Sequence, residues 1–270
     1  MPKVSVVICC ANAEATLPAA LASAAWADER VVVDSGSDDQ TAAIAQRDAD
    51  VYRLEPWRGY SGQKKFGAEL AANDWVLVLD GDEEVSPKLA EQIGALTDEE
   101  LEGLDVVYMN RRNWVMGRPV RAWWPDQQSR LIHRYRVHWP EEALHDDRRP
   151  SDPSRTQTLS GHLEHKRVGV TGLESWSDYF SGRRLDERMM PVARQMYAEG
   201  KRATWFSLAI RPVSAFLKFY VIRRGFLDGR FGLLIAQKAM FSVQLKYAAL
   251  WAVQNEAKRQ GSADEKVEND

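Results

Sequence analysis

Four carboxylates follow directly on an apolar run in the segment WVLVLDGDEEVSP, which begins at Trp75. They are Asp80, Asp82, Glu83 and Glu84. Like charges that cluster in this way repel one another, so a folded protein keeps them together where something offsets the repulsion. An Asp-Gly-Asp turn lets two carboxylates reach one hard cation, and Mg²⁺ or Mn²⁺ favours a few carboxylates together with substrate phosphates. The segment therefore predicts a divalent-cation site, with a capped, solvated turn before a helix as the alternative.

Two more segments place polar residues directly after apolar runs. CCANAE puts Asn12 and Glu14 after the first run, and DSGSDD begins at Asp34 after the second. In an open parallel sheet, ligands bind outside the carboxyl ends of the strands. We therefore expect these three side chains to converge with the Asp80–Asp82 turn at one edge of a sheet.

The elements that would position these residues alternate along the first hundred residues. The expected strands are residues 4–10, 30–34, 50–54 and 75–80, and the expected helices are residues 15–26, 39–47, 59–74 and 87–96. Ser86 is placed to cap the helix that Pro87 opens. The alternation predicts an α/β fold with a mainly parallel sheet and flanking helices.

From about Asp105 the pattern changes. Strand-like segments separated by loops reach residue 172, and the composition is helical from there to about residue 258. We expect residues 1–104 and 105–172 to be two halves of one domain, and residues 173–258 to be a helical extension. The charged stretch 259–270 lacks an apolar pattern, which predicts a disordered tail.

Composition limits the classes of function. Of 270 residues, 44% are hydrophobic and 28% charged, and the net charge of −3 gives no overall attraction to nucleic acid. The adjacent Cys9 and Cys10 would point to opposite faces of a strand, which indicates thiols in a reducing compartment. We see no signal-peptide pattern and no run of 18 uncharged apolar residues, so we expect a cytoplasmic protein without a spanning helix.

Three segments resemble the inverting family 2 glycosyltransferases, which have a GT-A (Rossmann-like) fold. They are VSVVICCANAEATL, ADERVVVDSGSDDQT and GQKKFGAELAANDWVLVLDGDEEVSP. Further segments are similar to the subgroup that builds lipopolysaccharide core, adding glucose or a similar sugar to heptose or Kdo: GYSGQKKFGAEL, RAWWPDQQSRLI, LHD and GFLDGRFG. The resemblance covers roughly residues 1–255. It implies a nucleotide-sugar-binding half followed by an acceptor-binding, catalytic half with mixed strands, and then C-terminal helices.

The resemblance also implies site residues. For the nucleotide-sugar donor, with a UDP-sugar favoured, they are Asn12, Glu14, Asp34, Lys64 and Asp80. Among them, Asp34 would contact the uracil or ribose and Lys64 the diphosphate. Asp82, with Asp80 and His165, would hold Mn²⁺ or Mg²⁺, since such enzymes often place a third metal ligand late in the fold and imidazole suits Mn²⁺.

Three positions depart from the family pattern. Lys65 stands where many relatives have Asn, Gly81 where Ala is usual, and Cys10 at a common Thr position. None of these departures removes a carboxylate. They therefore bear on the preferred nucleotide and leave the reaction type intact.

Transfer with inversion also requires a general base, which takes the proton of the acceptor hydroxyl, while the cation accepts the charge of the departing diphosphate. The candidates in the second half are Asp126, Glu141, Glu142 and Asp146. Related enzymes carry a His-Glu pair followed by Leu here, so Asp146 ranks first by position, with Asp126 and Glu142 behind it. A surface acid is the alternative interpretation for each.

The segment RRNWVMGRPVRAWWPDQQSRLIHRYRVHW interleaves Arg with Trp and Tyr. Nucleic acid can use that mixture, and so can sugars and phosphorylated glycolipids; amphipathic strands with solvated arginines are a further alternative. With a sugar-transfer site upstream, we favour a lipid-linked saccharide acceptor and expect no nucleic-acid partner.

The stretch from Thr204 to Gln254 mixes apolar residues with Arg and Lys. Two interpretations stay open: helices that pack in a core, or helices that lie in a membrane interface. The second would add peripheral contact with the inner membrane.

Other functions also stay open. The same fold and donor could serve a polysaccharide, polyprenyl phosphate or protein acceptor. A non-catalytic glycan-binding or tethering module is the alternative from another class. A nucleotidyltransferase is disfavoured because no Gly-rich N-terminal loop with a basic residue is present.

Overall fold

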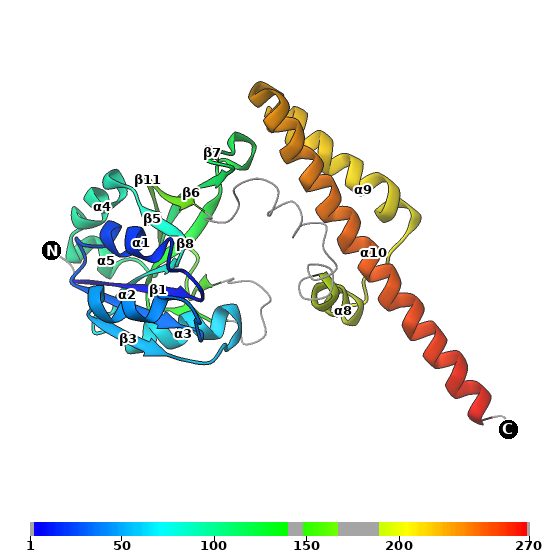
Figure 1. Ribbon diagram of the computed structural model, residues 1–270, viewed down its shortest axis with the longest axis horizontal. Coiled ribbons are helices and arrows are strands. Elements are labelled where there is room, and N and C mark those ends of the chain that lie inside the picture. Colours follow the sequence, from blue (N-terminus) through cyan, green and yellow to red (C-terminus); the bar gives the residue numbers. More distant parts are fainter. Residues whose placement is uncertain (1–2, 140–147, 167–188, 269–270) are drawn as a thin grey trace. The chain divides into compact units, whose positions relative to one another are not determined.

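The computed structural model describes residues 3–139, 148–166 and 189–268, with side chains as far as residue 260. Internal contacts divide the chain into two units, drawn in Figure 1. The first consists of Met1–Pro119 and Trp124–Gly169, and the second of Val120–Trp123 and Val170–Asp270. The first unit is α/β and the second is helical.

Nine described strands of the first unit form one sheet. They are β1 (Val4–Cys10), β2 (Glu29–Asp34), β3 (Val51–Leu54), β4 (Trp75–Asp80), β5 (Glu83–Val85), β6 (Val106–Val115), β7 (Arg118–Pro119), β8 (Gln127–His133) and β11 (Thr156–Lys166). Their order is β3-β2-β1-β4-β8-β6-β11-β5, with β7 paired to β6. The first four are parallel, β8 is antiparallel to both β4 and β6, and β9 (Val137–His138) pairs separately with β10 (Arg149–Pro150). The predicted α/β class, with a parallel half followed by mixed strands, is confirmed.

The apolar strands of the parallel half are buried on both faces. In β1, Val6 and Ile8 pack into one apolar cluster and Val7 packs into another. Helices α1 (Leu17–Ser23), α2 (Thr41–Asp48), α4 (Pro87–Gly94) and α5 (Asp98–Glu102) contribute to the first cluster, and α3 (Gly59–Leu70) contributes to the second. Helices on both faces explain why these strands are continuous apolar runs rather than alternating ones.

The ends of two helices test the sequence analysis in detail. The backbone N–H of Leu89 donates to Ser86 Oγ at 3.3 Å, so Ser86 caps α4 as predicted. Helix α2 begins at Thr41, two residues later than predicted. Ser37 or Asp38 is the cap that the sequence predicts for this helix, but both residues hydrogen-bond to Asn12.

Strand β5 is absent from the sequence prediction, which has a polar turn there. Its partner is β11, with Glu83 opposite His165 and Val85 opposite Leu163. The two strands are about eighty residues apart in the chain, so no local sequence pattern predicts that they pair. The consequence is that Glu83 enters the sheet and lies fully buried.

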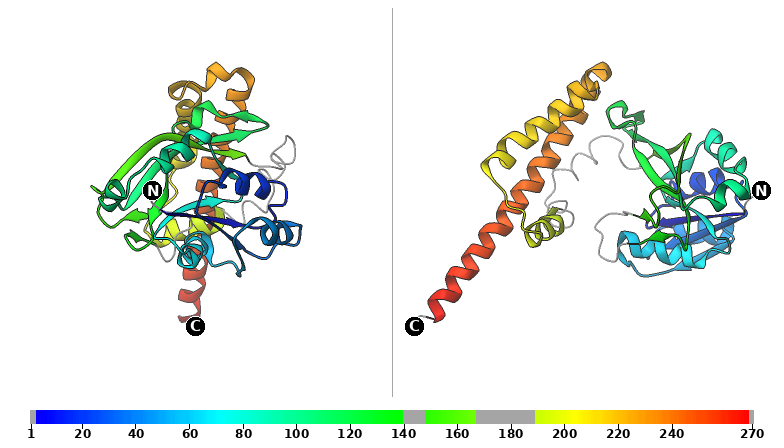
Figure 2. Two further views of the ribbon diagram at one scale, coloured as in Figure 1. Left: turned by 90° about the vertical axis from the view of Figure 1, so that its left-hand side faces the viewer. Right: turned by 180° about the vertical axis from the view of Figure 1, so that it is seen from behind.

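The second unit is helical, which confirms the predicted C-terminal helices. Its described elements are η1 (Arg121–Trp123), α8 (Met190–Ala198), α9 (Trp205–Leu217), η3 (Lys218–Ile222), η4 (Gly225–Asp228) and α10 (Gly229–Glu268). Figure 2 shows α9 alongside the first half of α10. Small and apolar side chains, among them Ala193, Tyr247 and Leu250, form the core of this unit.

Helix α10 differs from the sequence prediction at its end. It continues to Glu268, whereas the composition of residues 259–270 predicts a disordered tail. Most of these residues are adequate helix formers, and extending an existing helix needs no new nucleation. A polar composition is therefore compatible with helix where a long helix already precedes it.

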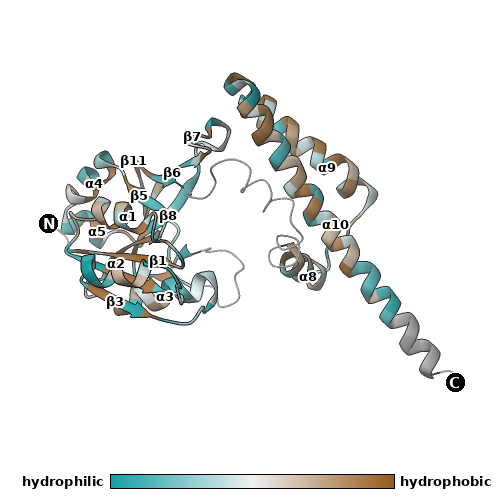
Figure 3. Ribbon diagram, viewed as in Figure 1, coloured by the Kyte–Doolittle hydropathy of each residue, from teal (hydrophilic) through white to brown (hydrophobic). Residues whose placement is uncertain are grey.

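One segment within the described residues, Trp205–Ile222, is long and apolar enough to cross a membrane by length and composition alone. Its mean hydropathy is 1.3, and 11% of it is buried. The uncharged run that we looked for in the sequence is absent because Arg211 and Lys218 lie within the segment. Figure 3 shows hydrophobic residues recurring along α9 and the first half of α10, while the later turns of α10 are hydrophilic.

Candidate active site

The carboxyl ends of β1, β2 and β4 meet at one edge of the sheet. The strand register places Cys9 beside Asp80 and Cys10 beside Asp34. The N–H of Gly81 donates to the carbonyl of Cys9 at 3.1 Å, which holds the Asp80–Asp82 turn against the end of β1. The polar strand ends that the sequence singled out are therefore brought together.

Asn12 and Glu14 support the loop that follows β2. Asn12 has a positive φ of 51° and accepts a hydrogen bond from Asp38 N–H at 3.0 Å through its side-chain oxygen. Glu14 accepts from Gln40 N–H at 3.1 Å. Both side chains thus fix the backbone at the edge where the donor was predicted to bind.

Asp34 lies fully buried beneath the same loop. Its Oδ1 accepts from the Ser37 hydroxyl at 2.6 Å and from the N–H groups of Gly36 and Ser37, and its Oδ2 accepts from the Tyr52 hydroxyl at 3.2 Å. Burial, followed by the Asp34 charge, raises the pKa of Tyr52, so the phenol stays a donor. The described contacts of Asp34 shape the loop, and a contact with uracil or ribose would require one of these partners to yield.

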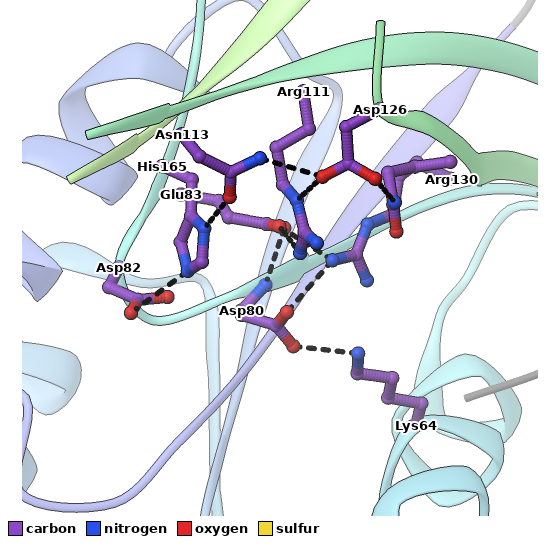
Figure 4. Close-up of polar contacts among 10 residues, drawn as sticks. Lys64, Asp80, Asp82, Glu83, Arg111, Asn113, Asp126, Arg130 and His165 are labelled. Atoms are coloured by element: carbon purple, nitrogen blue, oxygen red, sulfur yellow. Dashed lines mark hydrogen bonds and ion pairs between the residues drawn. The ribbon is translucent and has the colours of Figure 1, made fainter. Parts of the chain in front are cut away.

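Asp80 stands between two cations (Figure 4). Lys64 Nζ lies 2.6 Å from its Oδ1, and Arg130 Nη2 lies 2.8 Å from its Oδ2. Burial alone would raise the pKa of Asp80, but the Arg130 and Lys64 charges hold that pKa well below its ordinary value. Lys64, which we predicted to meet a diphosphate, is thus held by Asp80 at the edge of the sheet.

Glu83 connects this group to the interior. Its Oε1 accepts from Arg130 Nη2 at 2.6 Å and from Arg111 Nη1 at 3.1 Å, while its Oε2 accepts from Asp80 N–H at 3.1 Å. Desolvation lowers the pKa of Arg111, but the charges of Glu83 and Asp126, with the hydrogen bond to Asp126, together outweigh it and the pKa is raised. Glu83, one of the four clustered carboxylates, thus has partners in Arg111 and Arg130, which the sequence did not single out. The signal for these two arginines was their place in the segment that interleaves Arg with Trp and Tyr.

Asp82 and His165 form a second pair on the other side of Glu83 (Figure 4). His165 Nε2 lies 3.3 Å from Asp82 Oδ2, and His165 Nδ1 lies 2.7 Å from Asn113 Oδ1. The Asp82 side chain is 30% exposed and that of His165 only 7%. The Asp82 carboxylate is therefore the part of this pair that solvent or a ligand can reach, while the imidazole lies mostly buried behind it.

The hydrogen bonds around His165 assign the tautomer of its imidazole. Asn113 Nδ2 donates to Asp126 Oδ2 at 2.7 Å, so the amide oxygen of Asn113 must face the imidazole. Nδ1 then carries the hydrogen, and in the neutral ring Nε2 presents a lone pair toward Asp82. A lone pair beside a carboxylate is a donor set that suits a cation, and an oxygen acceptor behind a ligating histidine is the usual support for one.

This pair is small for a metal site. Among the residues that the structure describes, no group of three or more His, Cys, Asp or Glu side chains could hold a metal ion. Mg²⁺ and Mn²⁺ sites that act on phosphates commonly take one or two protein ligands and complete the shell with phosphate oxygens and water. Two ligands at Asp82 and His165 fit that pattern.

Of the four candidate general bases, one lies within the described residues and three lie outside them. Asp126 accepts from Arg111 Nε at 2.9 Å, from Asn113 at 2.7 Å and from Gln128 Nε2 at 2.8 Å. Three donors therefore engage its oxygens, which suits a carboxylate that orients its neighbours. Glu141, Glu142 and Asp146 lie outside the described residues.

Comparison with known proteins gives a consistent picture. A family model described as Glycosyl transferase family 2 matches residues 5–151. An uncharacterized glycosyltransferase of Rickettsia felis is 27% identical over 266 residues, which cover 93% of this chain and 90% of that protein. A lipopolysaccharide core biosynthesis glycosyltransferase, LpsC of Rhizobium meliloti, is 29% identical over 236 residues, covering 80% of each.

Solved structures are similar at a lower level. S. aureus TarS 1–349 in complex with UDP-GlcNAc is 17% identical with a TM-score of 0.47, covering 96% of this chain and 92% of that one. A similarity of this size supports no inference about ligands.

Proposed function

Because this chain belongs to glycosyl transferase family 2, we propose that it is an inverting, metal-dependent hexosyltransferase. The proposed donor is a nucleotide-diphosphate sugar, with a UDP-sugar favoured and glucose or a similar sugar transferred. The proposed acceptor is lipopolysaccharide core, a lipid-linked saccharide at the cytoplasmic side of the inner membrane.

One observation carries the metal part of this proposal. The chain Asp126–Asn113–His165 fixes the imidazole so that Nε2 faces the Asp82 carboxylate at 3.3 Å. In this proposal Asp82 and His165 would hold Mn²⁺ or Mg²⁺, which would supply Lewis-acid stabilisation of the departing diphosphate. The predicted role of Asp80 as a metal ligand is less well supported, because both of its oxygens already face cations.

Lys64 and Arg130 supply positive charge at the same edge. In the proposed complex, the diphosphate lies near the Lys64 ammonium, while Asp80 keeps that ammonium and the Arg130 guanidinium in place. Asn12, Glu14 and Asp34 would shape the nucleotide pocket by fixing the loop after β2. Their hydrogen bonds to this loop favour a rigid pocket over direct contact of every side chain with the nucleotide.

The general base is proposed among Asp146, Asp126 and Glu142, with Asp146 ranked first. Asp126 is disfavoured by its three hydrogen-bond donors, which give it an orienting role toward Asn113 and Arg111. A base must also lie within hydrogen-bond reach of the acceptor hydroxyl. Replacement of Asp146 by Asn tests the ranking: it should abolish transfer and leave donor binding intact.

The acceptor is supported by the similarity to LpsC over 80% of the chain. A polysaccharide, a polyprenyl phosphate or a protein acceptor is the alternative with the same fold and donor. A non-catalytic glycan-binding module is disfavoured by the intact Asp82–His165 pair.

Donor turnover followed by nuclear magnetic resonance tests the proposal. UDP-glucose, with and without Mn²⁺, is incubated with the protein alone and with purified lipid A–core acceptors. Inversion of the α-linked donor predicts β-glucose as the first product of slow hydrolysis and a β-linkage in the acceptor product. A binding module turns over no donor under any condition. Turnover with polyprenyl phosphate alone would replace the acceptor assignment.

A further inference from the structure

Helix α9 exposes an apolar stripe. The stripe consists of Phe206, Ile210, Val213 and Leu217 of α9 and continues to Val221 of η3, and each of these residues is between 48% and 59% exposed. Their spacing of four, three, four and four residues places them on one helical face. A surface helix ordinarily turns such a face inward, but the buried residues of α9 are Ser207 and Pro212. The helix therefore presents apolar side chains outward.

The elements at both ends of α9 extend this surface. Trp205 at the start of the helix is 83% exposed, and Ile222, Phe226 and Leu227 at the bend toward α10 are 74%, 48% and 57% exposed. Arg224 at that bend has a left-handed backbone with φ of 56°, which helps the chain to reverse. We call the stripe together with these four residues the apolar face.

The segment that carries the apolar face is strongly basic. Residues 201–250 contain nine Lys or Arg and one acidic residue, a net charge of +8, whereas the other 220 residues contain 27 basic and 38 acidic residues, a net charge of −11. The single acid, Asp228, pairs with Arg121 at 3.3 Å. Lys218, Arg224 and Arg230 are exposed beside the face. A partner that covers it must therefore be apolar in part and negatively charged.

We propose that the apolar face lies on the surface of an anionic lipid bilayer. The stripe would enter the boundary between headgroups and acyl chains, Trp205 would lie at headgroup depth, and the basic residues would meet lipid phosphates. This inference stands on the exposed side chains and their charge, and it does not depend on sugar transfer.

Two other occupants fit less well. A second copy of the chain would bring one segment of net charge +8 against another, and like charges across an interface oppose association. A spanning arrangement would draw Arg211 and Lys218 into the hydrocarbon. Arg211 also donates to the Tyr247 hydroxyl, which ties α9 to α10.

Vesicle flotation of the full chain tests the proposal. Vesicles of phosphatidylcholine alone are compared with vesicles that also contain phosphatidylglycerol. We expect partitioning to the anionic vesicles at least about tenfold stronger, and weakened by added salt because exposed charges are screened. Equal partitioning to both vesicle types, or none to either, overturns the proposal.

Matched variants locate the surface. Phe206→Gln with Leu217→Gln should lower partitioning to anionic vesicles at least about tenfold, whereas Leu54→Gln with Tyr135→Gln, which are 61% and 71% exposed on the first unit, should leave it unchanged. Gln preserves helix propensity, and circular dichroism checks the fold. Lys218→Gln with Arg230→Gln should weaken binding at low salt, and Lys3→Gln with Lys88→Gln should not.

Three results would overturn the assignment. Loss of binding in the control variants to the same degree as in the α9 variants would place the contact elsewhere. Resistance of the native protein to alkaline carbonate extraction would identify a spanning helix. A dimer in light scattering that Phe206→Gln with Leu217→Gln dissociates, without vesicle binding, would identify a second copy as the occupant.

Discussion

His165 Nε2 lies 3.3 Å from Asp82 Oδ2, and the opposite ring nitrogen lies 2.7 Å from Asn113 Oδ1. His165 lies on strand β11 and Asp82 lies in the turn after β4, and these two elements are far apart in the chain. Asp126 fixes the amide of Asn113 and, through it, the hydrogen of the imidazole. The carboxylate and the ring lone pair are therefore oriented before any ligand arrives.

Asn113→Ala tests this orientation. Loss of the acceptor behind a ligating histidine typically weakens metal affinity about 10- to 100-fold. We expect Mn²⁺ affinity in the presence of UDP, measured by calorimetry, to fall by that factor. Asn110→Ala is the control, because Asn110 lies on the same strand and its side chain points to the other face of the sheet. Equal losses in both variants would contradict the orienting role.

Glu83 and its neighbour Glu84 should differ sharply in their effect on stability. Glu83 is fully buried between Arg130 and Arg111, so Glu83→Ala removes one of the two carboxylates that pair with each of these guanidinium groups and should cost about 3–5 kcal/mol. Glu84 pairs with Lys166 at 2.9 Å with both side chains partly exposed, so Glu84→Ala should cost less than about 1 kcal/mol. Urea unfolding measures both. Similar losses would mean that the buried network is not intact in solution.

Asp80 predicts a specific pH dependence. Its pKa in the folded chain is held well below the ordinary value by Arg130 and Lys64, although burial opposes this. Its contribution to stability is therefore complete above the unfolded value of about 4 and is lost as the pH falls toward the folded pKa. Wild type should lose more free energy of unfolding than Asp80→Asn between roughly pH 4 and pH 2. Parallel curves over that range, from urea titrations at each pH, would refute this assignment.

Gly81 lies against β1. A Cβ added there would lie 2.6 Å from Cys10 Cβ and 3.3 Å from Ala13 Cβ, so Gly81→Ala should destabilise the protein by about 1–3 kcal/mol. Gly94→Ala, where a Cβ would meet nothing within 4 Å, should be neutral or stabilising. Thermal unfolding compares the two. An unchanged midpoint for Gly81→Ala would show that the turn moves freely away from the strand.

The strands of the parallel half could be predicted because their apolar runs depend on burial alone. Val4–Cys10 and Trp75–Asp80 were delimited to the residue. Ser86 could be predicted as a cap because its bond spans three residues. For these two strands and this cap, the local signal and the structure agree.

Long-range pairing could not be predicted. Glu83 looks like a solvated helix-turn acid because its partners, Arg111 and Arg130, lie 28 and 47 residues away. No local sequence pattern identifies Asn113 as a partner of His165, because the two residues are brought together only by the pairing of β6 with β11. The departures at Gly81 and Cys10 from the family pattern adjoin each other, since a Cβ at Gly81 would lie 2.6 Å from Cys10 Cβ.

Titration of UDP into the protein by calorimetry, with and without Mn²⁺, tests the central claim most directly. We expect Mn²⁺-dependent binding by wild type, a loss of at least about tenfold in Asp82→Ala and in His165→Ala, and no change in Asp48→Ala, which replaces a partly exposed acid on α2 that pairs with Arg47. UDP binding that is independent of Mn²⁺ and unaffected by Asp82→Ala would contradict the proposed metal site.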